Sequence, residues 1–284
     1  MRALLVVAAL AGTAAADSKS DVEALVRAHL TASTGKQKGF YKTLASEYQI
    51  SDASGFLLSL FSCEPKDACD NDVPVFEQSW FGKFSFANIR PIVWIDPGDQ
   101  VATFYATADL TADLLTQGGA AKGKTQFRLA GVAKREGGSW RVAGAKYALA
   151  LPDAALLRGE DLHDSVFAPT SPVEKAVASW FGHLASHMSA NAIGANGTAP
   201  AELATAPAAM ARLAASWDKL SLTPTSFTTI DLGTVAIVLL DVTFRAKAHP
   251  VSMSCAIVAV KQGDTWSWSA IDFGARFGVD QALH

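Results

Sequence analysis

The sequence lacks the excess of basic residues that a nucleic-acid-binding protein needs. Its 284 residues include 24 lysines and arginines against 27 aspartates and glutamates, which gives a formal net charge of −3. Nucleic-acid binders displace counterions from phosphates with a basic surface. We therefore expect no nucleic-acid partner.

Long apolar runs are also missing, so we expect no membrane insertion. The apolar stretch of residues 3–11 is shorter than the roughly 20 residues that a membrane-spanning helix needs. Arg2 precedes this stretch and small alanines follow it, an order typical of a secretory signal peptide. The sequence predicts a signal peptide over residues 1–16, cleavage before Asp17, and a secreted or periplasmic location.

Cysteine is scarce, with three in the whole chain. Cys63 and Cys69 lie in the polar segment SCEPKDACDND, and in an oxidising compartment such a pair is expected to close as a disulfide. Half of a metal site is the alternative, although no histidine stands nearby. Cys255 lies in an apolar run, where we expect a small buried side chain.

Familiar catalytic signatures are absent as well. The sequence contains no Gly-x-Ser-x-Gly elbow and no dinucleotide-binding fingerprint, and we expect no cofactor. His183 and His187 have the spacing of two metal ligands on one face of a helix. The glutamate of a zinc-protease helix and a third ligand are both lacking, so a polar helix edge without metal is the favoured interpretation.

What the sequence does contain is an internal repeat. The phrase IDPGDQVA begins at Ile95, and IDLGTVA begins at Ile230. Further matches follow in the same order along the chain, and the separation between partners only shrinks. These pairs are Val22 with Val173, Trp80 with Trp217, Val101 with Val235, Lys134 with Lys261, and Trp140 with Trp266. Several matches in one order indicate a duplicated domain.

Each copy opens with an amphipathic helix and continues into strands. In copy two, Ser171 is positioned to cap the helix and Pro172 to take its first turn. Apolar side chains recur at helical spacing in both copies. They are Val22, Leu25, Val26, His29 and Leu30 in copy one, and Val173, Val177, Trp180, Phe181 and Leu184 in copy two.

Gly- and Asp-containing turns separate the later strands, which indicates antiparallel hairpins. The sequence therefore predicts an α+β fold of two tandem domains, residues 17–151 and 172–284, joined by a linker over residues 152–171. In each domain, the N-terminal helices are expected to pack on a curved antiparallel sheet.

The turn phrase at Ile95, and the later hairpin that ends in Gly-Ser-Trp-Arg-Val, resemble the SnoaL-like and ketosteroid-isomerase-like branch of the nuclear transport factor two superfamily. The resemblance covers residues 21–151 and 171–277. It implies cone-shaped domains whose open end can hold a small apolar ligand. It also implies pairing through the sheets, so the two copies are expected to form an internal pseudo-dimer.

Where members of this family are enzymes, a carboxylate or histidine in the pocket moves a proton. The candidates for that role are Asp241, which interrupts the apolar run VLLDVTF, and Asp109. Tyr105 and Asp272 are the pocket candidates for ligand binding. Alternate strand positions also face solvent, where such residues need no function.

Because the repeated residues are structural ones, we expect an exported, non-catalytic protein that binds a small apolar ligand or acts as a scaffold. The alternative is an isomerase, cyclase or hydrolase that uses a pocket carboxylate.

Overall fold

The computed structural model describes residues 2–35, 37–52, 81–116, 119–149, 168–195, 203–246 and 249–275. The predicted Cys63–Cys69 disulfide, the repeat residue Trp80 and most of the predicted linker lie outside these ranges. The described elements form two units, each with its own sheet.

The first unit joins two helices to a five-stranded sheet. Its strands lie in the order β1-β5-β4-β3-β2. The elements are α1 (Arg2–Ser33), α2 (Gln37–Tyr41), β1 (Leu44–Asp52), β2 (Phe81–Ile95), β3 (Val101–Thr116), β4 (Gly119–Glu136) and β5 (Ser139–Leu149).

The second unit repeats this plan with a six-stranded sheet in the order β7-β6-β11-β10-β9-β8. Its helices are α4 (Pro172–Trp180), α5 (Pro207–Trp217) and two 3-10 turns, η3 (Leu184–His187) and η4 (Asp218–Leu220). Its strands are β6 (Met188–Ala195), β7 (Leu203–Ala204), β8 (Thr223–Asp231), β9 (Val235–Ala246), β10 (His249–Gln262) and β11 (Thr265–Ala275).

The α+β fold class is confirmed, but the sheets are mixed and not purely antiparallel. Strand β1 pairs in parallel with β5, and β6 pairs in parallel with β11. Neither first strand was predicted, because LASEYQISD and MSANAIGA lack a continuous apolar alternation. Each is held by a partner far along the chain, which local patterns do not reveal.

The repeated phrase forms the same turn in both units. The Asp96 carboxylate accepts a hydrogen bond from the Gly98 N–H (3.0 Å), and the Asp231 carboxylate accepts one from the Gly233 N–H (2.8 Å). An aspartate that accepts from the backbone two residues on stabilises a tight turn. The phrase therefore marks architecture in both copies.

A shared strand irregularity supports the duplication independently. The pairing of β4 with β5 shifts between Val132 and Ala133, and that of β10 with β11 shifts between Val258 and Ala259. Bulges are specific features of a fold. Their matching places agree with the alignment of Trp140 with Trp266.

The predicted helix signals of the second unit are present in α4. Ser171 caps the helix and Glu174 closes a capping box, with Pro172 in the first turn. Helix α4 ends at Trp180, so Phe181 and Leu184, which we placed on the same helical stripe, lie beyond it. In α1, the expected stripe from Val22 to Leu30 is buried against the sheet.

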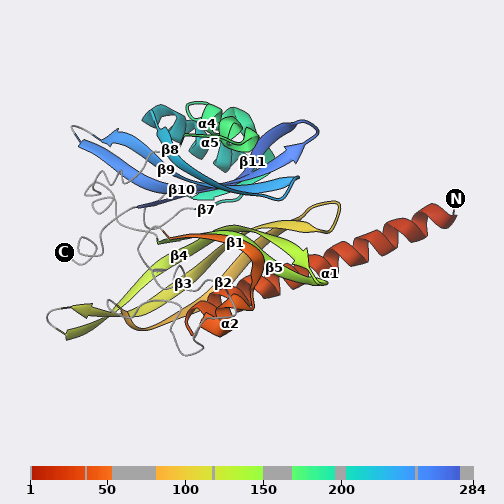
Figure 1. Ribbon diagram of the computed structural model, residues 1–284, viewed down its shortest axis with the longest axis horizontal. Coiled ribbons are helices and arrows are strands. Elements are labelled where there is room, and N and C mark those ends of the chain that lie inside the picture. Colours follow the sequence, from red (N-terminus) through yellow and green to blue (C-terminus); the bar gives the residue numbers. More distant parts are fainter. Residues whose placement is uncertain are drawn as a thin grey trace.

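The elements stack in layers, with the two sheets in the middle and the helices outside (Figure 1). Helices α4 and α5 cover the outer face of the second sheet, and α1 and α2 cover the outer face of the first. In each unit, an apolar core lies between the helices and the sheet. A third apolar cluster joins the sheets to each other, and it includes Val101, Tyr105 and Val132 of the first unit with Ile237 and Val258 of the second.

Within the described residues, none of the helices combines the length and the apolar character that a membrane span requires.

Candidate functional site

A buried polar cluster ties the two sheets together. The Asp272 carboxylate on β11 accepts hydrogen bonds from the Tyr105 hydroxyl (2.6 Å), the Arg128 Nε (2.8 Å) and the Lys146 ammonium (3.0 Å). Arg128 also donates to the Phe273 carbonyl (2.8 Å). All four side chains of the cluster are at most 1% exposed. Three belong to the first unit and one to the second, so the cluster fixes how the units sit together.

Electrostatics keep the Asp272 carboxylate ionised. Burial alone raises the pKa of the Asp272 carboxyl, but the charges of Arg128 and Lys146 outweigh burial and hold the pKa below its ordinary value. Burial, with the neighbouring Asp272 charge, raises the pKa of the Tyr105 hydroxyl well above its ordinary value. Tyr105 therefore stays protonated and remains a hydrogen-bond donor to Asp272.

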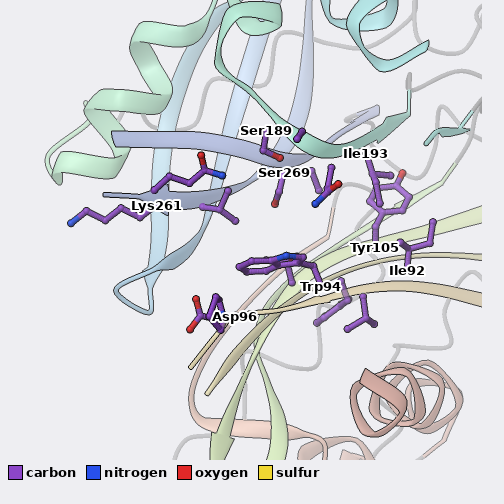
Figure 2. Close-up of a pocket in the computed structure, with 17 residues that line it drawn as sticks. Ile92, Trp94, Asp96, Tyr105, Ser189, Ile193, Lys261 and Ser269 are labelled. Carbon is purple, nitrogen blue, oxygen red and sulfur yellow. The ribbon is translucent and has the colours of Figure 1, made fainter. Parts of the chain in front are cut away.

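A pocket of about 540 Å³ opens beside this cluster, between the two units. Strands β2 and β3 supply one side, and β6, β10 and β11 supply the other (Figure 2). Its volume falls within the roughly 300–1,000 Å³ range of small-molecule sites. The family resemblance implied a ligand at the open end of each cone, whereas this pocket lies between the units.

The pocket walls are mostly apolar, with a few polar groups. The apolar part is formed by Ile92, Val93, Trp94, Phe104, Ile193 and Val260. Trp94 is 37% exposed although it is a large aromatic residue. Figure 2 shows its indole between the units, with Ser189 and Ser269 on the opposite side.

The polar groups of the pocket differ in how they are bonded. The Ser269 hydroxyl donates to the Val258 carbonyl (3.3 Å), and the Tyr105 hydroxyl donates to Asp272. The Ser189 hydroxyl is buried, and no described residue gives it a hydrogen-bond partner. A buried hydroxyl without a partner is costly, so a water or ligand atom that hydrogen-bonds to Ser189 would stabilise the pocket.

The two charged lining residues, Asp96 and Lys261, are of opposite sign. Asp96 accepts from its own turn, at the Gly98 N–H. The Lys261 ammonium lies over the Trp266 ring, 5.8 Å from its centroid. Each of these charged side chains therefore already has a contact within its own unit. Their opposite charges leave the pocket close to neutral.

The structure brings together the two residues that we named as pocket candidates. Tyr105 lines the pocket, and its hydroxyl bonds to Asp272, which lies behind the pocket wall in the buried cluster. Arg128 and Lys146, the other members of the cluster, were missed. Basic residues at alternate strand positions normally face solvent, and here a second sheet covers them.

The two predicted catalytic carboxylates lie elsewhere. Asp109 is exposed on β3 and accepts a hydrogen bond from the Asn88 side chain (2.6 Å). Asn88 sits at a bulge of β2 with a φ of 51°, a backbone that asparagine tolerates. Asp241 is half-buried on β9 between Thr225 of β8 and Ser254 of β10. Neither lines the described pocket.

The histidine pair does not share a helix face, contrary to the expected geometry. Helix α4 ends at Trp180, His183 precedes the η3 turn, and His187 stacks on Trp180 with ring centroids 5.7 Å apart. Among the described residues, no group of three or more His, Cys, Asp or Glu side chains is placed to hold a metal ion. Cys255 is buried, as expected, and burial raises the pKa of its thiol.

His29 is a buried histidine in the first unit, and the sequence placed it only in the apolar stripe of a helix. The Thr43 hydroxyl donates to the Phe40 carbonyl (2.6 Å), so it accepts from the Nδ1–H of His29 (2.7 Å). The Nε2 atom of His29 then accepts from the Tyr147 hydroxyl (2.5 Å). Burial lowers the pKa of His29 to about 3. This neutral histidine thus connects α1 to β5 within the core.

One sequence match to a phosphate-binding loop also escaped the sequence analysis. Residues 118–125, GGAAKGKT, fit the spacing Gly-x-x-x-x-Gly-Lys-Thr, a motif that works as a loop between a strand and a helix. Here Gly123, Lys124 and Thr125 lie within β4 and pair with β3. The extended backbone of a paired strand does not form the loop that cradles a phosphate.

Comparisons with known proteins give structural neighbours only. No known family model matches the chain, and no curated protein matches it. A putative ketosteroid isomerase from Shewanella frigidimarina is 14% identical and covers 39% of this chain and 100% of its own, with a TM-score of 0.33. A putative scytalone dehydratase from Novosphingobium aromaticivorans is 9% identical and covers 46% of this chain and 83% of its own, with a TM-score of 0.34.

The association domain of CaMKII from C. elegans is a third neighbour, 14% identical, covering 47% of this chain and 97% of its own, with a TM-score of 0.31. Each of these matches covers less than half of this chain.

Proposed function

We propose that this chain is an exported, non-catalytic protein that binds a small, mainly apolar ligand between its two units. The observation that carries the proposal is the pocket of about 540 Å³ at the inter-unit boundary, with apolar walls and few polar groups. Small-molecule sites commonly have this composition and occur where domains meet.

The placement of the acidic side chains favours binding over catalysis. A proton-moving carboxylate must reach the reacting atom. Of the described lining residues, only Asp96 carries a carboxylate, and it is occupied by the turn at Gly98. The candidates Asp109 and Asp241 lie outside the lining.

Export is part of the proposal. Ser18, just beyond the proposed cleavage site, accepts a hydrogen bond from the Arg135 guanidinium (2.8 Å). Cleavage before Asp17 would therefore leave the docked part of α1 in place. We further infer that the packed sheets give one chain the pairing that single-domain relatives would obtain as dimers.

A thermal-shift screen of uncharged apolar metabolites against the whole chain tests the binding proposal, since a ligand that binds the folded state raises the melting temperature. Ala190→Trp places a bulky ring at an exposed lining position and should abolish the shift. Ala215→Trp, at an exposed position of α5, is the matched control and should leave it unchanged. A shift that survives Ala190→Trp, or turnover of a bound compound, would contradict the proposal.

A further inference from the structure

The two copies can be compared position by position at the pocket. Met188 of β6 pairs with Trp268, two residues after Trp266, and Leu44 of β1 pairs with Val142, two residues after Trp140. Because the two tryptophans correspond, Ser189 in the second unit corresponds to Ala45 in the first.

The opposite wall can be aligned in the same way. Trp94 pairs with Thr103, two residues after Val101, and Ile230 pairs with Ile237, two residues after Val235. By strand pairing, Trp94 in the first unit therefore takes the place of Ile230 in the second. This differs by one position from the sequence match of Ile95 with Ile230, because the turn of the first unit is one residue longer. Each corner between the units thus combines an edge strand of one copy with the first strand of the other.

The two corners are filled differently. At one corner Ala45 is fully buried in the inter-sheet cluster, and Ile230 packs against that cluster. At the other corner the chain has a larger aromatic residue, Trp94, which stays 37% exposed. Facing it is Ser189, whose buried hydroxyl lacks a partner among the described residues.

These two differences between the copies, Trp94 and Ser189, together indicate which kind of ligand the pocket can bind. An indole presents a flat face that favours stacking with another ring. A buried hydroxyl without a partner favours a ligand that brings one hydrogen-bonding atom. The lining charges Asp96 and Lys261 balance each other, so nothing in the described lining selects an ion.

We propose that the pocket binds a neutral planar aromatic ligand that carries a hydroxyl group, with its ring against Trp94 of the first unit and its hydroxyl on Ser189 of the second. This ligand class rests on the proposed binding function. Such a ligand would touch both units, and its affinity would depend on how they are packed.

Calorimetric titration of the full chain with three probes tests the proposal. The probes are 2-naphthol, naphthalene, which lacks the hydroxyl, and decahydro-2-naphthol, which lacks the flat ring. We expect 2-naphthol to bind about 5–10-fold more tightly than naphthalene, because one buried hydrogen bond is lost. Decahydro-2-naphthol should also bind several-fold more weakly than 2-naphthol.

Two variants assign these differences to the named residues. Ser189→Ala should weaken 2-naphthol about 5–10-fold and leave naphthalene unchanged. Trp94→Leu keeps an apolar side chain and should weaken both aromatic probes several-fold. Ser254→Ala is the matched control, because Ser254 is equally buried with an unpartnered hydroxyl but lies outside the lining. It should leave all three affinities unchanged.

The results distinguish a wrong ligand class from a pocket that binds no ligand. Equal affinities for 2-naphthol and naphthalene, unaffected by Ser189→Ala, would overturn the ligand class while leaving a binding pocket in place. If none of the probes binds and no apolar metabolite stabilises the chain, both proposals fail.

Discussion

At the scale of single residues, the fold changes the protonation of His29. It is fully buried, and both of its ring nitrogens are hydrogen-bonded, to Thr43 and Tyr147. Burial lowers its pKa to about 3, so the folded protein holds it neutral. The unfolded chain binds a proton there below its ordinary pKa of about 6.5.

His29 should therefore make the protein less stable in mild acid. Since the pKa of the folded state is depressed, its contribution is complete above pH 6.5 and is lost as the pH falls toward 3. Between pH 6 and 4.5 the free energy of unfolding should fall by about 1.4 kcal/mol per pH unit more steeply than in His29→Gln. Urea unfolding at several pH values measures both slopes, and parallel slopes would refute the assignment.

Asp272 should be the most costly carboxylate to neutralise. Asp272→Asn keeps the shape of the side chain but removes the carboxylate charge that pairs with the buried Arg128 and Lys146. Breaking a buried ion pair in this way typically costs about 3–5 kcal/mol. Asp109→Asn, on an exposed carboxylate, is the control and should cost less than about 0.5 kcal/mol. Equal losses in denaturant unfolding would show that the buried cluster does not hold the units together.

Sequence patterns identified some of these residues but did not reveal their contacts. Tyr105 and Asp272 were named as pocket candidates because they are polar residues on predicted strands, but nothing local indicates that side chains 167 residues apart share a hydrogen bond. Asp109 looked equivalent to them in sequence, yet it is exposed and supports Asn88. Burial by a second sheet decides the difference, and it is a property of tertiary packing.

At the scale of elements, the start of helix α4 shows how local signals are tied to the sheet. The Glu174 carboxylate accepts from the backbone N–H groups of Thr170 (2.8 Å) and Ser171 (2.9 Å), and from the Thr229 hydroxyl of β8 (2.8 Å). Burial alone would raise the pKa of Glu174, but these hydrogen bonds outweigh it and lower the pKa to about 2.

Glu174 should stabilise the fold above its ordinary pKa of about 4.5, and this stabilisation should be lost as the pH falls toward 2. At pH 7 Glu174→Gln should lower the free energy of unfolding by on the order of 3 kcal/mol, and the difference from the natural chain should shrink below pH 4.5. The control, Glu23→Gln, removes a partly exposed pair with Arg27 and should cost under about 1 kcal/mol. A pH-independent loss at Glu174 would contradict the account.

Elements with strong local signals were predictable from the sequence, and those held by distant partners were not. The cap at Ser171, the stripe of α1 from Val22 to Leu30 and the Gly-containing turns were all recognised from residue type and spacing. Strands β1 and β6 were missed because each forms by parallel pairing with the last strand of its unit. The histidine spacing misled because α4 stops at Trp180 before His183 is reached.

At the scale of the whole molecule, duplication is the feature that the sequence predicted best. Matching turns at Asp96 and Asp231, and matching bulges in β4–β5 and β10–β11, support it in the structure. The inter-unit pocket was not predictable, because it arises from how the two copies meet. It depends on differences between the copies that the repeated phrases do not reveal, such as Trp94 at the place that strand pairing gives to Ile230.

The central claim is that the two units pack face to face and form the pocket between them. Small-angle X-ray scattering on residues 17–284 tests it most directly. The account predicts one compact particle, with a radius of gyration of about 18–20 Å for a chain of this length and a single-peaked distance distribution. A clearly larger radius with two separated maxima would mean independent lobes, and would contradict both the packing and the pocket.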